Sequence, residues 1–118
     1  MRITSQTVQD ALIKSLADEY CRKIILSTIN KAQSVEELSQ SENIPISTTY
    51  RRVNEMKDVG ILTVEKTVLT EEGKKFELYR SAFKAIHMDL NQAEILIDVE
   101  LNEDVATRLS RLWASMRA

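Results

Sequence analysis

The sequence has 118 residues, of which 43% are hydrophobic and 29% charged, and its formal net charge at pH 7 is −2. This length supports one hydrophobic core but not two independent ones. No run approaches the roughly 18 apolar residues that a membrane helix needs, and the N-terminal residues lack an apolar signal core. A single cysteine, Cys21, excludes an internal disulfide. We therefore expect one cytoplasmic domain without a membrane partner.

Motifs of catalysis and of metal binding are absent from the sequence. It contains no Gly-rich phosphate loop, no GxSxG and no HExxH. One His, His87, and one Cys, Cys21, leave little material for a nucleophile–base pair or a metal site. We expect no enzymatic activity, no metal and no cofactor. Cys21 is expected to be a buried core thiol, with a redox switch as the alternative.

The first 30 residues are predicted to be helical. Thr4 or Ser5 can cap a helix over residues 6–17, whose apolar stripe is formed by Val8, Leu12 and Leu16. Asp18 is a break or a second cap before residues 19–30. The apolar face of that segment consists of Cys21, Ile24, Ile25, Leu26 and Ile29. The pattern leaves open whether residues 6–30 form one bent helix or two.

A helix-turn-helix is predicted over residues 34–58. Ser34 and Glu37 form a capping-box pattern that opens a short helix. The polar link 41–44 is so short that Ile44 must turn inward before a second helix over about 46–58. Gly60 suits a left-handed cap after that helix. The inward stripe of the helix over 46–58 consists of Thr49, Val53 and Met56. Its outward face carries Ser47, Arg51, Asn54 and Asp58, with Thr48 and Tyr50 on the flanks.

Two β-hairpins are predicted after Gly60. Residues 62–68 alternate as a strand does, residues 70–73 fit a tight turn, and residues 75–81 return with Val68 opposite Phe76. The same register places Lys66 opposite Leu78. A competing interpretation makes residues 70–80 a helix capped by Thr70. Residues 84–90 and 94–101 then form an additional hairpin with one apolar face, and Asn102 caps a final helix.

The pieces SVEELSQSENIPISTTYRRVNEMKDVGIL and VLTEEGKKFELY, roughly the middle half of the chain, resemble the winged helix-turn-helix transcription regulators. The resemblance is strongest to the ArsR-like branch and its archaeal-type relatives. It implies an α+β fold with a winged core over residues 18–81. Residues 1–17 and 83–118 would be dimerisation extensions of the same domain: an N-terminal helix, the additional hairpin and a C-terminal dimerisation helix. The paired metal-binding cysteines of that branch are absent.

We expect a sequence-specific, homodimeric regulator of transcription with double-stranded DNA as its partner. The helix over 46–58 would enter the major groove, and the wing over 62–81 would contact flanking DNA. The candidate DNA-binding residues are Ser47, Thr48, Tyr50, Arg51, Arg52, Asn54, Lys74 and Lys75. The candidate dimer residues are Val8, Leu12, Leu16, Val105, Leu109, Leu112, Trp113 and Met116.

Each candidate contact also has an ordinary structural interpretation. The two arginines can form ion pairs with Glu55 or Asp58 on a solvated helix face. Ser47 and Thr48 can satisfy local backbone groups, and Tyr50 can fill a gap beside the preceding helix. At the wing tip, Glu71 and Glu72 oppose a role of the two lysines in DNA binding.

The distribution of charge favours DNA binding, whereas its total does not. Residues 1–43 carry −1, residues 44–84 carry +2 and residues 85–118 carry −3. The small excess on the helix and wing predicts modest non-specific affinity. The acidic total favours an alternative, a winged-helix module that binds proteins of the transcription machinery without binding DNA tightly. The sequence specifies neither an operator nor a small-molecule effector.

Overall fold

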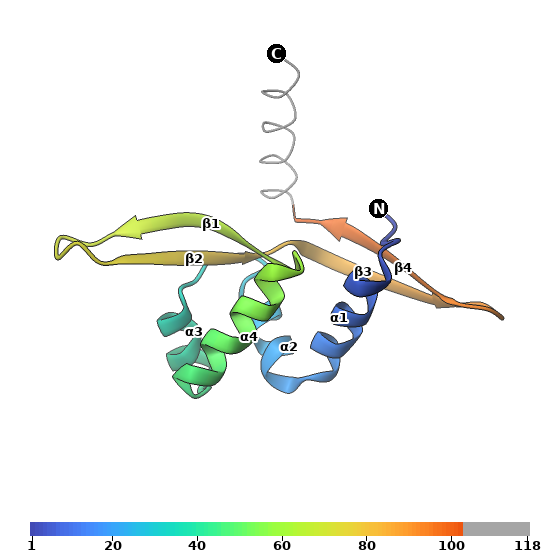
Figure 1. Ribbon diagram of the computed structural model, residues 1–118, viewed down its shortest axis with the longest axis horizontal. Coiled ribbons are helices and arrows are strands. Elements are labelled where there is room, and N and C mark those ends of the chain that lie inside the picture. Colours follow the sequence, from blue (N-terminus) through green and yellow to red (C-terminus); the bar gives the residue numbers. More distant parts are fainter. Residues whose placement is uncertain (103–118) are drawn as a thin grey trace, which may run out of the picture.

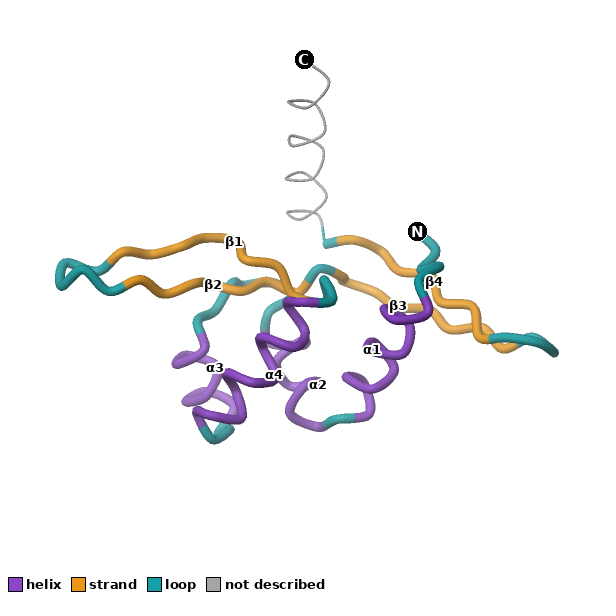
Figure 2. Tube along the Cα trace, in the orientation of Figure 1, coloured by secondary structure: helices purple, strands orange, loops and turns teal. Residues whose placement is uncertain are grey.

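The computed structural model describes residues 1–102, whose helices lie on one side of two antiparallel hairpins (Figure 1). The helices are α1 (Gln6–Ala17), α2 (Glu19–Ser27), α3 (Val35–Glu42) and α4 (Ile46–Asp58). The first hairpin pairs β1 (Leu62–Leu69) with β2 (Lys75–Ser81), and the second pairs β3 (Phe83–Leu90) with β4 (Ile95–Leu101). The hairpins extend in opposite directions (Figure 2). The expected final helix, with Val105, Leu109, Leu112, Trp113 and Met116, lies outside the described residues.

The first two helices are separate, because a side chain caps the start of each. Ser5 Oγ accepts a hydrogen bond from the Val8 N–H at 3.3 Å. Asp18 Oδ1 accepts one from the Cys21 N–H at 2.9 Å. These bonds satisfy backbone donors that have no partner within the first turn of a helix. The alternative of one bent helix over residues 6–30 is therefore wrong.

The end of α2 differs from the expectation. The helix stops at Ser27 rather than Asn30, and the Thr28 hydroxyl donates to the Ile24 carbonyl at 2.8 Å. Thr28 thereby satisfies a carbonyl that the next turn of helix would have used. The chain then leaves the helical path, and Leu26, which we assigned to the apolar face, is 68% exposed. That assignment is wrong.

The predicted capping box and tight turn shape the helix-turn-helix. Ser34 and Glu37 each accept, through the side chain, a hydrogen bond of 3.1 Å from the other's backbone N–H. At the end of α3, Asn43 adopts a left-handed conformation with φ 54°, which asparagine tolerates better than most residues. Ile44 then turns into the core, as expected, and its N–H donates to the Ser39 carbonyl. The turn brings α4 across α3.

The first hairpin is the wing, and its register is as predicted. Val68 lies opposite Phe76 and Lys66 opposite Leu78, so the helical interpretation of residues 70–80 is wrong. Gly73 has φ +84°, the left-handed conformation that favours glycine in such a turn. The backbones of Gln33 and Tyr79 exchange hydrogen bonds of 3.0 and 2.8 Å. This bridge attaches the wing to the start of the helix-turn-helix.

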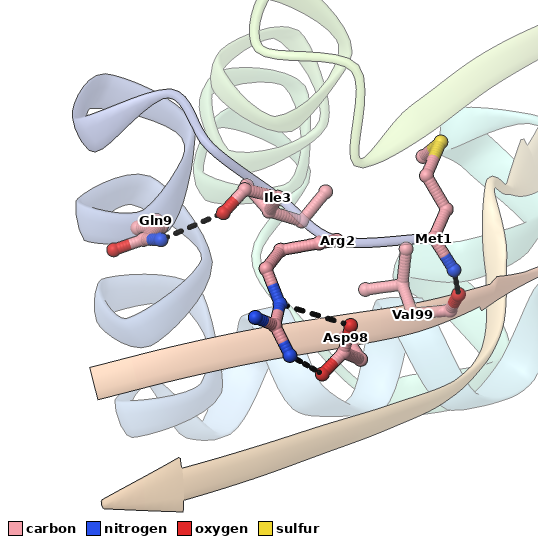
Figure 3. A network of polar contacts seen from close by, with 6 residues as sticks. All are labelled: Met1, Arg2, Ile3, Gln9, Asp98 and Val99. Atoms are coloured by element: carbon pink, nitrogen blue, oxygen red, sulfur yellow. Dashed lines mark hydrogen bonds and ion pairs between the residues drawn. The ribbon is translucent and has the colours of Figure 1, made fainter. Parts of the chain in front are cut away.

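The N-terminal residues pair with β4 through an isolated β-bridge between Arg2 and Asp98 (Figure 3). The Met1 ammonium donates to the Val99 carbonyl at 2.8 Å, and the Ile3 N–H donates to the Ile97 carbonyl at 2.9 Å. Between them, Arg2 forms an ion pair with Asp98 at 3.1 Å. This pairing covers the outer edge of β4 and places α1 beside the hairpin.

A buried junction joins the two hairpins. Only Ala82 separates β2 from β3, and its backbone bonds to both Ile61 and Asn102. Beside it, the Ile29 carbonyl accepts hydrogen bonds from Arg80 Nε at 2.8 Å and Asn102 Nδ2 at 2.6 Å. The wing, the second hairpin and the end of α2 therefore meet at one point.

The buried residues of all these elements form a single core cluster. Leu12 of α1 and Ile97 of β4 have no exposed surface and pack in the same cluster as the inner stripe of α4. The N-terminal helix and the second hairpin thus contribute to the fold of one protomer. Leu12 is fully buried in this core, whereas Val8 and Leu16 remain partly exposed, and the expected role of the three in a dimer interface stays a prediction. No helix within residues 1–102 is long and apolar enough to cross a membrane.

We expect the second hairpin to unfold together with the winged core. The Ile97→Ala substitution should lower the free energy of unfolding by about 2–5 kcal/mol, because it leaves a cavity at a fully buried position. Leu90→Ala, at the 80% exposed end of the same hairpin face, should change it by less than about 0.5 kcal/mol. Urea unfolding followed by circular dichroism measures both. Equal effects would show that the hairpin is not part of the cooperative core.

Candidate nucleic-acid interface

The α4 helix presents different residues to the core, to α1, to the wing and to solvent. Its inner stripe, Thr49, Val53 and Met56, is buried as predicted. This stripe fixes the rotation of the helix about its axis. The remaining positions are consequently divided among a face toward α1, a face toward the wing and an outward face.

The outward face of α4 carries exposed polar groups that have no partner among the described residues. Ser47, Arg51 and Asn54 are exposed, and they are spaced i, i+4 and i+7. Within residues 1–102, Arg51 forms no ion pair and no hydrogen bond. Hydroxyl, guanidinium and amide groups on one helix stripe can donate to base edges or to phosphate. The partly buried Thr48 flanks this stripe.

Arg52 lies on the face of α4 toward α1, where it is held by an ion pair. Its guanidinium lies 2.9 Å from Asp18 Oδ2, and 24% of its side chain is exposed. Its Nε is buried without a hydrogen-bond partner in the described part of the chain. To contact DNA, as expected from the sequence, Arg52 would have to leave Asp18. The ion pair instead ties α4 to the junction between α1 and α2.

A cleft of about 460 Å³ lies between the wing and the face of α4 that is turned toward it. Tyr50, Asn54 and Lys57 line it from α4, Val35 and Glu36 from α3, and Thr67, Lys75, Phe76, Glu77 and Tyr79 from the wing. Tyr50, Asn54 and Lys57 form one helix stripe, at i, i+4 and i+7. Asn54 belongs both to this stripe and to the outward face.

Two tyrosines hold two of the carboxylates in the cleft. Tyr50 Oη donates to Glu36 at 3.3 Å, and Tyr79 Oη donates to Glu77 at 2.8 Å. Burial and the neighbouring carboxylate raise the pKa of both phenols, that of Tyr79 to about 12. Both tyrosines therefore remain protonated donors at neutral pH. Tyr50 thus reaches across to α3, as its ordinary structural interpretation expects, and its contact with DNA stays a prediction.

The wing tip presents mixed charges. Lys74 and Lys75 are exposed as expected, and so are Glu71 and Glu72 in the same turn. The turn is held by the Thr70 hydroxyl, which accepts a hydrogen bond from the Lys74 N–H at 3.0 Å. Of these side chains, only that of Lys75 lines the cleft.

Sequence reasoning missed Lys57 and the engagement of Arg80. Lys57 continues the stripe of Tyr50 and Asn54, so helical periodicity alone could have found it. Arg80 counted toward the positive excess of the wing, but its guanidinium lies 2.9 Å from Glu65 and donates to the Ile29 carbonyl. No local sequence pattern predicts the contact between Arg80 and the Ile29 carbonyl, because the two residues are 51 positions apart.

Cys21 and His87 lie neither on α4 nor among the residues that line the cleft. Cys21 is buried on α2, and burial raises the pKa of its thiol to about 11, so the thiol is protonated at neutral pH. His87 is exposed on β3. Within residues 1–102, no three His, Cys, Asp or Glu side chains gather as a possible metal site.

The elements described above define the class of fold. A helix, a helix-turn-helix and a hairpin, with Gln33 bridged to Tyr79, have the arrangement of a winged helix-turn-helix. No family model matches the sequence, and no curated protein matches it. Among solved structures, the chain is similar to HlyU from Vibrio cholerae N16961, with 15% identity and a TM-score of 0.45 over 94% of this chain and 97% of that chain.

We expect Asp18 to stabilise the orientation of α4 through two separable contacts. Asp18→Ala removes the cap of α2 and the partner of Arg52, and should cost about 0.5–2 kcal/mol or slightly more. Asp18→Asn keeps the cap and should cost only about 0.2–1 kcal/mol. The exposed Asp10, whose side chain bonds within residues 1–102 only to that of Gln6, supplies the control Asp10→Ala. Urea unfolding at pH 7 compares the three variants.

The same contribution should depend on pH. The hydrogen bond from the Cys21 N–H, assisted by the charge of Arg52, lowers the pKa of Asp18. A lowered pKa in the folded state means that this stabilisation is complete above the ordinary pKa of aspartate and is lost as pH falls through the lowered value. The stability difference between the wild type and Asp18→Asn should therefore shrink in acid. A difference that stays constant down to pH 2 would contradict this account.

Proposed function

We propose that this chain is a sequence-specific DNA-binding transcription regulator of the winged-helix type, related to the ArsR-like branch, that acts as a homodimer. The observation that carries the proposal is the outward face of α4, where Arg51 is exposed without an ion pair or hydrogen bond in the described chain. Ser47 and Asn54 flank it on the same stripe. A helix of this width fits the major groove, and arginine is the commonest reader of guanine there.

Two other features support this proposal. The inner stripe of α4 is fully packed, and the Asp18–Arg52 ion pair holds its α1 side, so the outward face is presented rigidly. A helix that is already fixed in place loses less entropy when it binds than one that must be ordered first. The wing lies beside α4 across the cleft, where a groove adjoining the major groove would pass.

The proposal is tested by selecting DNA duplexes from a random-sequence pool and measuring their affinity for variants by fluorescence anisotropy. Arg51→Ala should weaken binding to the selected duplex by about 1–3 kcal/mol and relax the preference at one base position. Lys84→Ala removes the same charge from an exposed site on β3 and should have a much smaller effect. Enrichment of no duplex would overturn the proposal and favour the protein-binding alternative, which the net charge of −2 supports.

The homodimer is tested by light scattering. We expect a mass of twice the 13.5 kDa of one chain, and a selected site with two-fold symmetry. Leu112→Glu, on the apolar stripe predicted for residues 105–116, should shift the mass to that of one chain. Thr107→Glu, which lies off that stripe, is the control. A monomeric wild type bound to an asymmetric site would contradict this arrangement.

A further inference from the structure

The outer edge of β3 is an unpaired strand edge in the described part of the chain. β3 and β4 form a two-stranded sheet, so β3 has a neighbouring strand on one side only. On the far side of β4, the backbones of Ile97 and Val99 bond to the N-terminal residues. Backbone groups along an antiparallel strand point alternately to its two sides. The groups of Leu96 and Asp98 therefore point toward β3.

The same alternation shows which backbone groups of β3 are free. The register places His87 and Asp89 opposite the inward-pointing residues of β4, so their backbones bond to β4. The residues between and beside them direct their N–H and C=O groups to the other side. No backbone hydrogen bond within residues 1–102 uses those groups. These outward positions are Ile86, Met88 and Leu90.

The side chains of this edge also lack partners. Met88 and Leu90 are 43% and 80% exposed on the apolar face of the hairpin. On the opposite face, His87 and Asp89 are exposed and form no hydrogen bond or ion pair with the described residues. Asp98, which lies opposite His87, is already held in an ion pair by the N-terminal residues. Natural proteins usually cover or block such an edge, because it can pair with another strand.

We propose that the edge of β3 pairs antiparallel with β3 of a second copy of this chain, across a two-fold axis at Met88. The inference rests on the homodimer of the proposed function, and it names a contact of that dimer. In this register, Met88 lies opposite the partner's Met88, and Ile86 lies opposite the partner's Leu90. On the other face, His87 lies opposite the partner's Asp89. The two edges exchange about six backbone hydrogen bonds, and the two hairpins become one continuous sheet.

Charge and register select this axis over the others. Bonds can form only between outward positions, so the axis lies at or between them. An axis at Asp89 places two carboxylates directly opposite each other, which is destabilising, and an axis at His87 leaves each Asp89 without a cation. Axes at Ile86 or Leu90 extend the pairing into the buried junction or into the hairpin turn. An axis at Met88 sets each imidazole, which has an N–H donor, beside a carboxylate, where side chains of the two strands are closest.

This pairing accounts for the uncovered apolar end of the second hairpin. Leu90 lies opposite Ile95 within the hairpin, and both are exposed. In the paired sheet, Leu90 lies beside the partner's Ile86. Because Ile86 packs against the core, the exposed end of each hairpin is placed against the covered part of the other. Leu90 then contributes to the association of two copies rather than to the unfolding of one.

The first test exchanges the two charged positions and measures the dissociation constant of the dimer by sedimentation equilibrium. His87→Asp should raise it about tenfold, because two symmetric pairs change from attractive to repulsive. Adding Asp89→His should restore it to within about threefold of the wild type, because each carboxylate again faces an imidazole. The swapped variant keeps the new carboxylate opposite Asp98 of its own hairpin, so its recovery isolates the contact between copies.

The control for this test is Thr67→Asp, which makes the same change of charge at an exposed strand position of the wing. It should leave the dissociation constant unchanged. Circular dichroism spectra equal to that of the wild type verify that each variant folds.

The second test locates the axis by cross-linking under mild oxidation, followed by non-reducing electrophoresis. Met88→Cys should form a covalent dimer, because residues opposite each other in the register have Cα atoms about 5.5 Å apart, within the range of a disulfide. The matched control is Leu90→Cys, which is more exposed but is displaced by four residues, about 13 Å, from its own copy in the partner. It should cross-link much more slowly. The wild type should not cross-link, because the thiol of Cys21 is buried and its pKa is raised to about 11.

The outcomes separate the pairing of β3 from the proposed function. An unchanged dissociation constant for His87→Asp, a swapped variant that does not recover, or faster cross-linking of Leu90→Cys than of Met88→Cys overturns the pairing. The proposed function then stands if the wild type is a dimer that selects a symmetric duplex. A wild type that is monomeric at every concentration overturns both the pairing and the homodimer. A dimer that passes both tests but selects no duplex overturns the DNA-binding function alone.

Discussion

The Ile29 carbonyl and the neighbouring Ala82 form the constraint on which the rest of the architecture depends. Arg80 from the wing and Asn102 from the end of β4 donate to the same carbonyl, and this carbonyl lies just beyond the last turn of α2. A carbonyl oxygen has two lone pairs, and here both are engaged. Because the partners come from three elements distant in sequence, the wing cannot shift relative to α2 without breaking these bonds. The position of the wing beside α4 follows from this junction.

The functional surface arises from how α4 is divided by its neighbours. Burial of Thr49, Val53 and Met56 sets the rotation of the helix, and the Asp18–Arg52 ion pair fixes the side toward α1. What remains is an outward stripe centred on Arg51 and a stripe facing the wing. These two stripes share Asn54, so the outward face that we propose contacts the major groove and the cleft form one continuous surface. The helix α4 therefore presents two adjoining polar stripes, one toward solvent and one toward the wing.

Local patterns predicted the elements well, because each was encoded by residues near one another. The capping box at Ser34 and the pairing of Val68 with Phe76 involve short-range periodicity and turn chemistry, and both were found as expected. The partners of Arg52 and Arg80 were missed, because Asp18 and the Ile29 carbonyl come from segments brought near only by the tertiary fold. Leu26 was misplaced for a different reason: it lies within α2 next to the buried Ile24 and Ile25, and its apolar character alone does not specify how far the buried face of the helix extends.

The length of the connection at Ala82 also fixes which side of the second hairpin faces the helices. Side chains alternate along a strand, so one inserted residue between Ser81 and Phe83 would turn β3 over. Ile86, which packs against the core, would then point to solvent, and the exposed His87 and Asp89 would point toward the core. The chain thus tolerates no change in spacing here, although it can vary in length at either hairpin tip. An insertion at the tip of either hairpin would leave this orientation unchanged.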